Sequence, residues 1–229
     1  PSEEAMANTL ALMKQRGPDH QQIWTSEAAG GRKVCLLHSR LSIIDLDPRS
    51  HQPFTIEDTT LAYNGEIYNY VELRRELEQK GIELRTSSDT EVLLQYYRLY
   101  GEECLHHFEG MWSFAIFDAT RQTLFLARDR FGEKPLYLLR TSHGLYFGSE
   151  IKFLASLAQA SLRPNYEHLM RNLSLGYKAL YKTRQTFFEG VEELRYAQCL
   201  TAGPEGMGEP RRYRSPAPKI NTTMSLEEA

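Results

Sequence analysis

The stretch Leu61-Ala62-Tyr63-Asn64-Gly65-Glu66-Ile67-Tyr68-Asn69 joins two kinds of local pattern. Residues 61–63 are typical of the end of a strand. Asn64 and Gly65 then predict a break, because both residue types tolerate backbone angles that other residues avoid. From residue 70 onward, apolar residues recur at helical spacing until a lysine and a glycine end the run at residue 81. We therefore predict a strand, a turn and a helix in this order.

Two interpretations of this stretch remain open from its residues alone. An Asn-Gly pair is a strong hairpin signal, but a hairpin requires a second strand at once. Alternatively, the Asn64 amide, the unobstructed backbone N–H of Gly65 and the Glu66 carboxylate form a small polar binding site at the end of a strand. The helical pattern that follows is the feature that distinguishes a binding site from a plain turn.

The composition narrows the class of protein. The chain has 229 residues, of which 41% are hydrophobic and 25% charged, as in ordinary globular proteins. Its net charge of −3 gives no electrostatic footprint for nucleic acid or for an anionic membrane. We see no apolar run long enough to span a bilayer and no signal peptide. The three cysteines, Cys35, Cys104 and Cys199, lack metal-type spacing. We expect a cytoplasmic protein with reduced thiols, no metal site, and no nucleic-acid or membrane partner.

The order of the predicted elements indicates the fold class. Helices are expected over residues 1–15, 70–80, 88–99, 149–157 and 166–175. Strands are expected over residues 21–25, 34–39, 61–63, 82–86, 111–118, 123–129 and 145–148, with short pieces at 187–191 and 197–201. A further strand is expected between the charged loop of residues 129–137 and the turn of residues 141–144. This order is not the strict strand–helix alternation of a parallel doubly wound sheet, so it predicts a layered α+β fold. Glycine, proline and charge from residue 202 onward predict a linker.

Two charged residues have both a structural and a functional interpretation. Arg40 separates two apolar runs, so it either pairs with a structural acid or receives a carboxylate in its two-pronged guanidinium. Asp89 opens a helical pattern and either caps that helix or contributes a carboxylate to a site. From the residues alone, the structural interpretation is the favoured one for both.

Five blocks occur together and in order: Arg16-Gly17-Pro18-Asp19, His38-Ser39-Arg40-Leu41-Ser42-Ile43-Ile44-Asp45, Tyr63-Asn64-Gly65-Glu66-Ile67-Tyr68-Asn69, Ser88-Asp89-Thr90-Glu91 and Asp129-Arg130-Phe131-Gly132-Glu133-Lys134-Pro135-Leu136-Tyr137. Together they resemble the glutamine amidotransferase domain of glutamine-hydrolysing asparagine synthetases, a class II domain of the N-terminal-nucleophile type. The resemblance implies an α+β fold, a four-layer α/β/β/α sandwich of two antiparallel sheets between helical layers. It implies this domain over residues 1–201, with a linker and the first residues of an ATP-dependent synthetase domain over 202–229.

The resemblance also implies roles for the singled-out residues, and it favours the functional interpretation of Arg40 and Asp89. Arg40 would receive the α-carboxylate of glutamine, and Glu66 and Asp89 would lie near its α-amino group. The side-chain amide of Asn64 and the backbone N–H of Gly65 would form the oxyanion hole, the catalytic element that this chain retains. The backbone of four further residues would line the same pocket: Leu41, Ser42, Ile43 and Ile44.

The chain departs from the family pattern at the nucleophile. In the family this is a cysteine at the mature N-terminus, which is followed by a short strand. Nothing in the chain matches that strand, and Cys35, Cys104 and Cys199 lie at positions typical of buried thiols. We expect the chain as printed to lack glutaminase activity for this reason.

The implied function is that of the glutaminase half of an asparagine-synthetase-like amidotransferase. Glutamine would be hydrolysed to glutamate and ammonia for the ATP-dependent amidation of aspartate or a similar carboxylate. The expected partners are glutamine and a covalently linked synthetase domain, and a homodimer of the chain stays open. No cofactor is expected in this domain, and ATP and Mg²⁺ are expected in the synthetase domain. Two alternatives stay open: a catalytically dead scaffold like that of β-lactam synthetases, and a glutamine-binding module.

Overall fold

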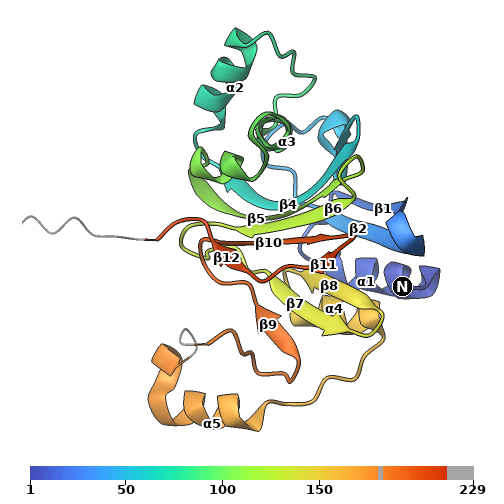
Figure 1. The fold of residues 1–229 in the computed structure, drawn as a ribbon, viewed down its shortest axis with the longest axis vertical. Helices are drawn as coiled ribbons and strands as arrows, with labels where there is room; N and C mark the ends of the chain where they lie inside the picture. Colours follow the sequence, from blue (N-terminus) through green and yellow to red (C-terminus); the bar gives the residue numbers. More distant parts are fainter. Residues whose placement is uncertain (180–182, 216–229) are drawn as a thin grey trace, which may run out of the picture.

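The computed structural model describes residues 1–179 and 183–215 (Figure 1). Its helices are α1 (Glu3–Met13), α2 (Tyr70–Gln79), α3 (Asp89–Tyr100), α4 (Ile151–Ala158) and α5 (Tyr166–Leu175). The strands are β1 (His20–Ala28), β2 (Arg32–Arg40), β3 (Phe54–Ile56), β4 (Thr59–Ile67), β5 (Gly110–Asp118), β6 (Thr123–Arg128), β7 (Tyr137–Thr141), β8 (Gly144–Gly148), β9 (Val191–Glu193), β10 (Gln198–Gly203), β11 (Gly206–Met207) and β12 (Arg211–Arg212).

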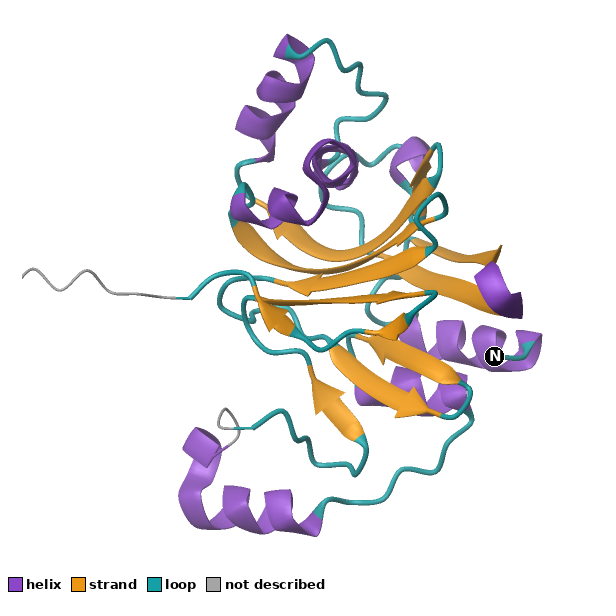
Figure 2. Ribbon diagram, viewed as in Figure 1, coloured by secondary structure: helices purple, strands orange, loops and turns teal. Residues whose placement is uncertain are grey.

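The elements form four layers (Figure 2). One layer is a seven-stranded sheet in the order β11-β10-β6-β5-β4-β3, with β12 also pairing with β10. The facing layer consists of two separate pieces, β1-β2 and β8-β7-β9, and every strand pair in both layers is antiparallel. Helices α2 and α3 cover the outer face of the seven-stranded sheet, and α1 and α4 cover the other side (Figure 1). The predicted α/β/β/α sandwich is therefore confirmed.

Three buried clusters fill the spaces between these layers. The first lies between α2, α3 and the seven-stranded sheet, the second between the sheets, and the third between β7, β9 and α4. Representative members, in that order, are Leu93 with Phe114, Leu36 with Leu126, and Leu139 with Leu154. Burial of apolar area at about 25 cal/mol per Å² is the main force that holds such layers together.

The central strand β4 is longer than the sequence predicts. It continues through Asn64 and Gly65 to Ile67, because β5 pairs with it over its whole length, as far as Gly110 opposite Ile67. The hairpin interpretation of Asn64-Gly65 is therefore wrong, since β4 is followed by α2 and not by a strand. The two residues do not end the strand but sit inside it.

The strand predicted over residues 82–86 is absent from the structure. This segment is a loop between α2 and α3. Its backbone is held by a side chain instead of a neighbouring strand: the Glu91 carboxylate accepts hydrogen bonds from the backbone N–H groups of Arg85 and Thr86. A single buried carboxylate thus replaces the neighbouring strand as the hydrogen-bond acceptor for this segment. The residues of the segment do not indicate this partner, so the strand prediction was wrong.

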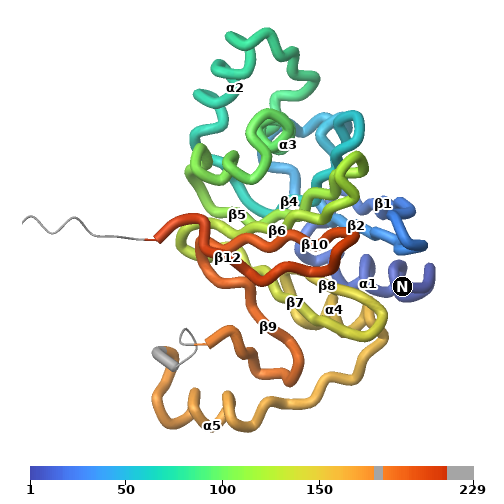
Figure 3. Tube along the Cα trace, in the orientation of Figure 1, coloured from blue at the N-terminus to red at the C-terminus, as the bar shows by residue number. Residues whose placement is uncertain are grey.

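The chain beyond residue 201 also differs from the prediction of a linker. Strand β10 continues to Gly203, and both β11 and β12 pair with it. The Tyr213 hydroxyl then donates a hydrogen bond to the carbonyl of Arg128. Residues 202–213 are thus attached to the seven-stranded sheet, whereas residues 216–229 lie outside the described part. Helix α5 belongs to the long segment that connects α4 to β9, and it lies apart from the four layers (Figure 3).

Candidate functional site

A cavity of about 340 Å³ lies where the end of β2, the middle of β4 and the start of α3 meet. Eight of the nine residues that the sequence analysis assigned to glutamine binding line it: Arg40, Leu41, Ile43, Ile44, Asn64, Gly65, Glu66 and Asp89. Ser42 does not line the cavity, and its backbone N–H donates to the Asp19 carboxylate at 2.7 Å. The fold thus brings together three of the sequence blocks that lie far apart in the chain.

The backbone N–H of Gly65 points away from β5. On that side of β4, the N–H groups of Tyr63 and Ile67 both bond to side chains outside the sheet, and strand alternation directs the Gly65 N–H the same way. The opposite residue, Trp112, has both its N–H and its carbonyl turned toward Asp129, so it does not pair with Gly65 through hydrogen bonds. The Gly65 N–H is therefore a donor at the cavity edge of β4.

Only glycine fits at position 65. Its φ is +149°, and a Cβ atom placed there would lie 2.2 Å from the carbonyl oxygen of Met111 and 2.6 Å from the Cα of Trp112. Both obstacles are backbone atoms of β5, which cannot move aside without opening the sheet. The close approach of β4 and β5 thus fixes the position of the Gly65 donor.

The Asn64 amide lies beside this donor. Its Nδ2 donates to the hydroxyl of Ser149, just before α4, at 3.2 Å. An amide nitrogen carries two protons, so one remains for a ligand. Asn64 and Gly65 together offer two neighbouring N–H donors to the cavity, the arrangement that stabilises a developing negative charge on oxygen.

Two carboxylates, Glu66 and Asp89, line the cavity on the same side as β4 and α3. Asp89 is 4% exposed, and its Oδ2 accepts hydrogen bonds from the Tyr63 hydroxyl at 2.8 Å and the Ile67 N–H at 3.1 Å. Burial raises the pKa of Asp89, and these two hydrogen bonds oppose that rise. Glu66 is half-buried, and its carboxylate makes no hydrogen bond or ion pair to another residue in the described part. The N-cap of α3 is Ser88, so Asp89 does not serve as the cap.

Arg40 lies at the other side of the cavity, and its side chain is buried. Its Nη1 bonds to the Asp47 carbonyl at 3.2 Å and to His51 Nδ1 at 2.8 Å, and its Nη2 bonds to the carbonyls of Ile44 and Asp45. The two terminal nitrogens are therefore directed at the loop after β2, and the Nε–H takes no part in these four hydrogen bonds. The predicted structural acid is not its partner, because these acceptors are three carbonyls and an imidazole.

Three histidines surround Arg40. The rings of His20 and His51 are stacked with centroids 3.6 Å apart. His38 donates from Nε2 to the Tyr63 carbonyl at 3.1 Å, so its Nδ1 is the unprotonated nitrogen. Burial lowers the pKa of His38 to about 4, and burial together with His20 and Arg40 lowers the pKa of His51. The lowered pKa values keep the rings of His38 and His51 neutral near pH 7, so these two rings add no positive charge beside Arg40.

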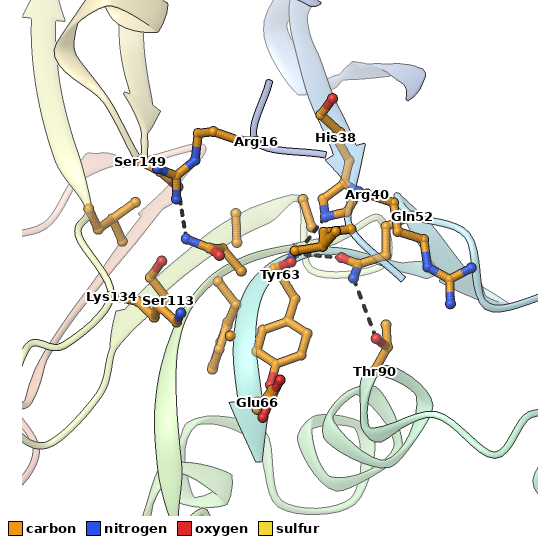
Figure 4. Close-up of a pocket in the computed structure, with 18 of the residues that line it drawn as sticks. Arg16, His38, Arg40, Gln52, Tyr63, Glu66, Thr90, Ser113, Lys134 and Ser149 are labelled. Atoms are coloured by element: carbon orange, nitrogen blue, oxygen red, sulfur yellow. Dashed lines mark hydrogen bonds between the residues drawn. The ribbon is translucent and has the colours of Figure 1, made fainter. Parts of the chain in front are cut away.

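Several further residues line the cavity that the sequence analysis did not assign to the site. Arg16 and Lys134 add positive charge, and Gln52 and Ser149 add polar groups. Arg16 bonds to Glu150 at 2.9 Å, and in the close-up it lies on the opposite side of Tyr63 from Arg40 (Figure 4). Arg16 and Lys134 lie within sequence blocks that carry the resemblance, whereas Ser149 had no local signal besides its place before a helix.

A second cavity of about 630 Å³ adjoins the first and lies between β2 and β8. It shares Met13, Leu37, Ala62, Phe147 and Phe153 with the first cavity. Strand β2 pairs only with β1, and β8 only with β7, among the strands of residues 1–179 and 183–215. The facing edges of β2 and β8 thus bound a slot, which we call the β2–β8 slot, and it opens into the site.

The three cysteines lie outside the smaller cavity. Cys35 lines the β2–β8 slot, and Cys104 and Cys199 are buried in the core under α3. Burial raises the pKa of all three thiols, and that of Cys199 reaches about 11. None of them is therefore an activated thiolate beside the Asn64 and Gly65 donors.

Two kinds of feature are absent from the part of the chain that the structure describes. No group of three or more histidine, cysteine, aspartate or glutamate side chains there is arranged to hold a metal ion. No helix there combines the length and the apolar character needed to cross a bilayer.

Comparison with known proteins gives a consistent result. Residues 1–214 match the family model described as a glutamine amidotransferase domain. The chain is 36% identical over 208 residues to asparagine synthetase [glutamine-hydrolyzing] 3 of Bacillus subtilis (strain 168), and 41% identical over 206 residues to synthetase 1 of the same organism. Each match covers 89% of this chain but only 32% and 31% of the respective relative.

A solved structure has the same fold. Glutamine phosphoribosylpyrophosphate amidotransferase from B. subtilis, solved with ADP and GMP, superimposes with a TM-score of 0.64 at 19% identity. The match covers 90% of this chain and 45% of that chain.

Proposed function

The chain belongs to the glutamine amidotransferase domain family, and we propose that it forms the glutaminase half of an asparagine-synthetase-like amidotransferase. Glutamine is hydrolysed to glutamate and ammonia in the smaller cavity. The ammonia then serves a covalently linked synthetase domain, where ATP and Mg²⁺ activate aspartate or a similar carboxylate. The length of the relatives supports this second domain, because the chain spans about a third of each.

The observation that carries the proposal is the arrangement of groups along β4. Consecutive residues Asn64, Gly65 and Glu66 give two N–H donors and a carboxylate to one cavity, and Asp89 adds a second carboxylate. Free glutamine has an amide carbonyl, an ammonium group and a carboxylate. The donors suit the amide oxygen, the two acids suit the ammonium group, and the positive charge of Arg40 suits the carboxylate.

The role of the donors follows from the chemistry of amide hydrolysis. Attack on the amide carbon converts the carbonyl oxygen into an oxyanion, and the Asn64 amide and Gly65 N–H would donate to it. Such fixed donors act most strongly when the oxygen becomes charged, so they lower the barrier more than they tighten binding. Because β5 fixes Gly65 and Ser149 orients Asn64, the two donors need little rearrangement during the reaction.

Arg40 has to change its contacts to serve as the carboxylate receptor. Its terminal N–H groups contact the loop of residues 44–51, so a carboxylate must displace some of these acceptors or bind the Nε–H. A charged acceptor forms a stronger bond with a guanidinium than a neutral carbonyl does. The exchange would move the loop after β2, which carries the exposed side chains of Leu41 and Ile43 at the cavity.

The nucleophile belongs, in this proposal, to a segment outside the 229 residues. None of the described thiols lies in the smaller cavity, and all three have raised pKa values. The β2–β8 slot offers an extended segment two strand edges to pair with, and it leads to the Asn64 and Gly65 donors. A cysteine at the inner end of such a segment would attack the glutamine amide.

The experiment compares two proteins in an assay for glutamate release from glutamine. The proposal requires a longer natural protein that contains this chain and supplies the nucleophile. That protein should hydrolyse glutamine, and the 229-residue chain should not exceed the background rate. Robust turnover by the 229-residue chain would place the nucleophile within it and overturn that part of the proposal. No turnover by the longer protein, with its glutamine affinity intact, would identify a scaffold or binding module instead of a glutaminase.

A further inference from the structure

We propose that Tyr63 is a positioning residue, whose buried hydroxyl holds the Asp89 carboxylate in place as the receptor for the ammonium group of the ligand. This inference rests on the proposed function, since it takes glutamine as the ligand. It adds a residue to which neither the family resemblance nor the comparisons give a role.

The two oxygens of Asp89 have different surroundings. Oδ2 accepts the Tyr63 hydroxyl at 2.8 Å and the Ile67 N–H at 3.1 Å, whereas the Ser88 hydroxyl lies farther from Oδ1, at 3.4 Å. Oδ2 thus takes the two closest donors, and Oδ1, with one longer contact, is the oxygen that we assign to the ligand in the cavity that Asp89 lines. The Tyr63 bond selects which oxygen is presented and at what angle.

The backbone of Tyr63 is held on both its N–H and its carbonyl. Its N–H donates to the Gln52 side chain at 2.7 Å, and its carbonyl accepts from His38 Nε2 at 3.1 Å. Gln52 in turn reaches the Thr90 hydroxyl at the start of α3, and lies between Tyr63 and Thr90 (Figure 4). A tyrosine fixed relative to both β2 and α3 places its hydroxyl with little freedom, as a positioning group requires.

The charges around Asp89 explain why the carboxylate needs a donor. Glu66 on β4 is a second acid at the same wall, and Arg40 on β2 is turned toward its loop. His38 on β2 is neutral near pH 7, because burial lowers its pKa to about 4. Burial raises the pKa of Asp89. The hydroxyl therefore favours the ionised form of Asp89, together with the Ile67 N–H, the Ser88 hydroxyl and the Thr90 N–H.

The hydroxyl also stays protonated at pH 6 and pH 8, the two pH values of the test. Burial and the nearby charges of Asp89 and Glu66 raise the pKa of Tyr63 well above its ordinary value. It is thus a permanent donor, and its removal should leave Asp89 with the same burial but one hydrogen bond fewer. Asp89 would then take up a proton at a higher pH, and its attraction for an ammonium group would be lost as the pH falls.

The test uses the longer natural protein and two ligands at pH 6 and pH 8. One ligand is glutamine, and the other is 4-carbamoylbutanoate, which is glutamine without its amino group and is tested as a competitor of glutamine. The readouts are the KM for glutamine and the inhibition constant of 4-carbamoylbutanoate, or dissociation constants by calorimetry where turnover is absent. Tyr96→Phe is the matched control, because the buried Tyr96 donates a hydrogen bond of similar length, 2.7 Å, to the exposed Glu76 away from the cavity.

Tyr63→Phe should raise the KM for glutamine by up to about tenfold, with a larger effect at pH 6 than at pH 8 and with kcat changed less than twofold. Tenfold is the expected loss for one hydrogen bond to a charged group. Binding of 4-carbamoylbutanoate should change little, so the preference for glutamine over it should shrink. Tyr96→Phe should leave both constants at their wild-type values.

Two outcomes would overturn the inference. The first is a Tyr63→Phe protein with the wild-type preference for glutamine at both pH values. The second is a loss of both ligands by the same factor at both pH values, because that result indicates general damage to the fold. If Tyr63→Phe does not fold, 3,5-difluorotyrosine at position 63 keeps the ring and hydroxyl and strengthens the donor, so it should lower the KM for glutamine at pH 6. An unchanged KM would again overturn the inference.

Asp89→Asn separates this inference from the proposed function. If Asp89→Asn weakens glutamine binding while Tyr63→Phe does not, only the role of Tyr63 is wrong. If Asp89→Asn leaves glutamine binding unchanged, the assignment of the ammonium group in the proposed function is wrong, and the inference fails with it.

Discussion

The Nη1 atom of Arg40 lies 2.8 Å from Nδ1 of His51. Because a guanidinium can only donate, the Nδ1 of His51 carries no proton, which agrees with the lowered pKa of His51. This bond and the carbonyl contacts of Arg40 attach the end of β2 to the loop of residues 44–51. Arg40 therefore organises the wall of the cavity in addition to its proposed role toward glutamine.

Arg40→Lys should weaken glutamine binding more than tenfold. Lysine keeps the positive charge but loses both the fork that matches a carboxylate and the fixed pattern of donors toward the loop. The measurement is glutamine affinity by calorimetry on the longer natural protein, with Arg49→Lys as the control. Arg49 is a half-exposed arginine of the same loop that lies outside the cavity. Unchanged affinity in a folded Arg40→Lys protein would remove Arg40 from the site.

Asn64→Ala should lower kcat for glutamine hydrolysis by about 10²–10³ and change glutamine affinity much less. The reason is that the amide stabilises an oxygen that is charged only in the transition state. Steady-state glutamate release by the longer protein gives both constants. Asn69→Ala is a control, because Asn69 also makes backbone contacts after β4 but lies outside the cavity. Equal losses of kcat and affinity would make Asn64 a ground-state binding residue.

Gly65→Ala should destabilise the protein by about 1–3 kcal/mol more than Gly144→Ala. The two glycines have nearly the same backbone strain, with φ of +149° and +147°. A Cβ at Gly144 meets nothing within 4 Å, whereas one at Gly65 overlaps backbone atoms of Met111 and Trp112. Urea unfolding of both variants isolates the cost of the overlap. Similar midpoints for the two would mean that β4 and β5 separate easily at this point.

The stability of the 229-residue chain should fall as the pH drops from about 6.5 toward 4, with a contribution of up to about 3 kcal/mol from His38. Burial lowers the pKa of His38 from 6.5 to about 4, so below pH 6.5 the unfolded chain binds a proton that the folded chain excludes. Above pH 6.5 His38 is neutral in both the folded and the unfolded chain, so it no longer lowers the free energy of unfolding. Urea unfolding at pH 7.5, 5.5 and 4.5 should show a smaller decline for His38→Gln. His143→Gln, at an exposed turn, should decline as the wild type does, and an identical decline in all three proteins would contradict the assignment.

The sequence predicts the layers and most of the site because both follow from local patterns. The alternation in residues 111–118 and 123–129 gives β5 and β6, and the ordered blocks give eight lining residues. The course of β4 was not predictable, because the angles that Gly65 adopts are usual in turns and only the pairing with β5 makes them part of a strand.

The partners of Arg40 and of Asp89 were also beyond the sequence. Every residue has a backbone carbonyl, so the residue types of a loop do not show that it accepts hydrogen bonds from Arg40. The sequence predicts Tyr63 only as the end of a strand. Its hydroxyl can bond to Asp89 only because the fold packs the start of α3 against β4. The strand predicted at 82–86 failed for a similar reason, since the buried carboxylate of Glu91 satisfies that backbone.

The β2–β8 slot makes this domain a candidate for reconstitution from two separate molecules. Two strand edges that face each other across an open slot have backbone donors and acceptors on both sides, and an added extended peptide can pair with both. A synthetic peptide that begins with cysteine, mixed with the 229-residue chain, would supply the reactive group without a covalent join. Activity would then depend on peptide concentration, and peptides that differ at one position would report the shape and polarity of the slot residue by residue.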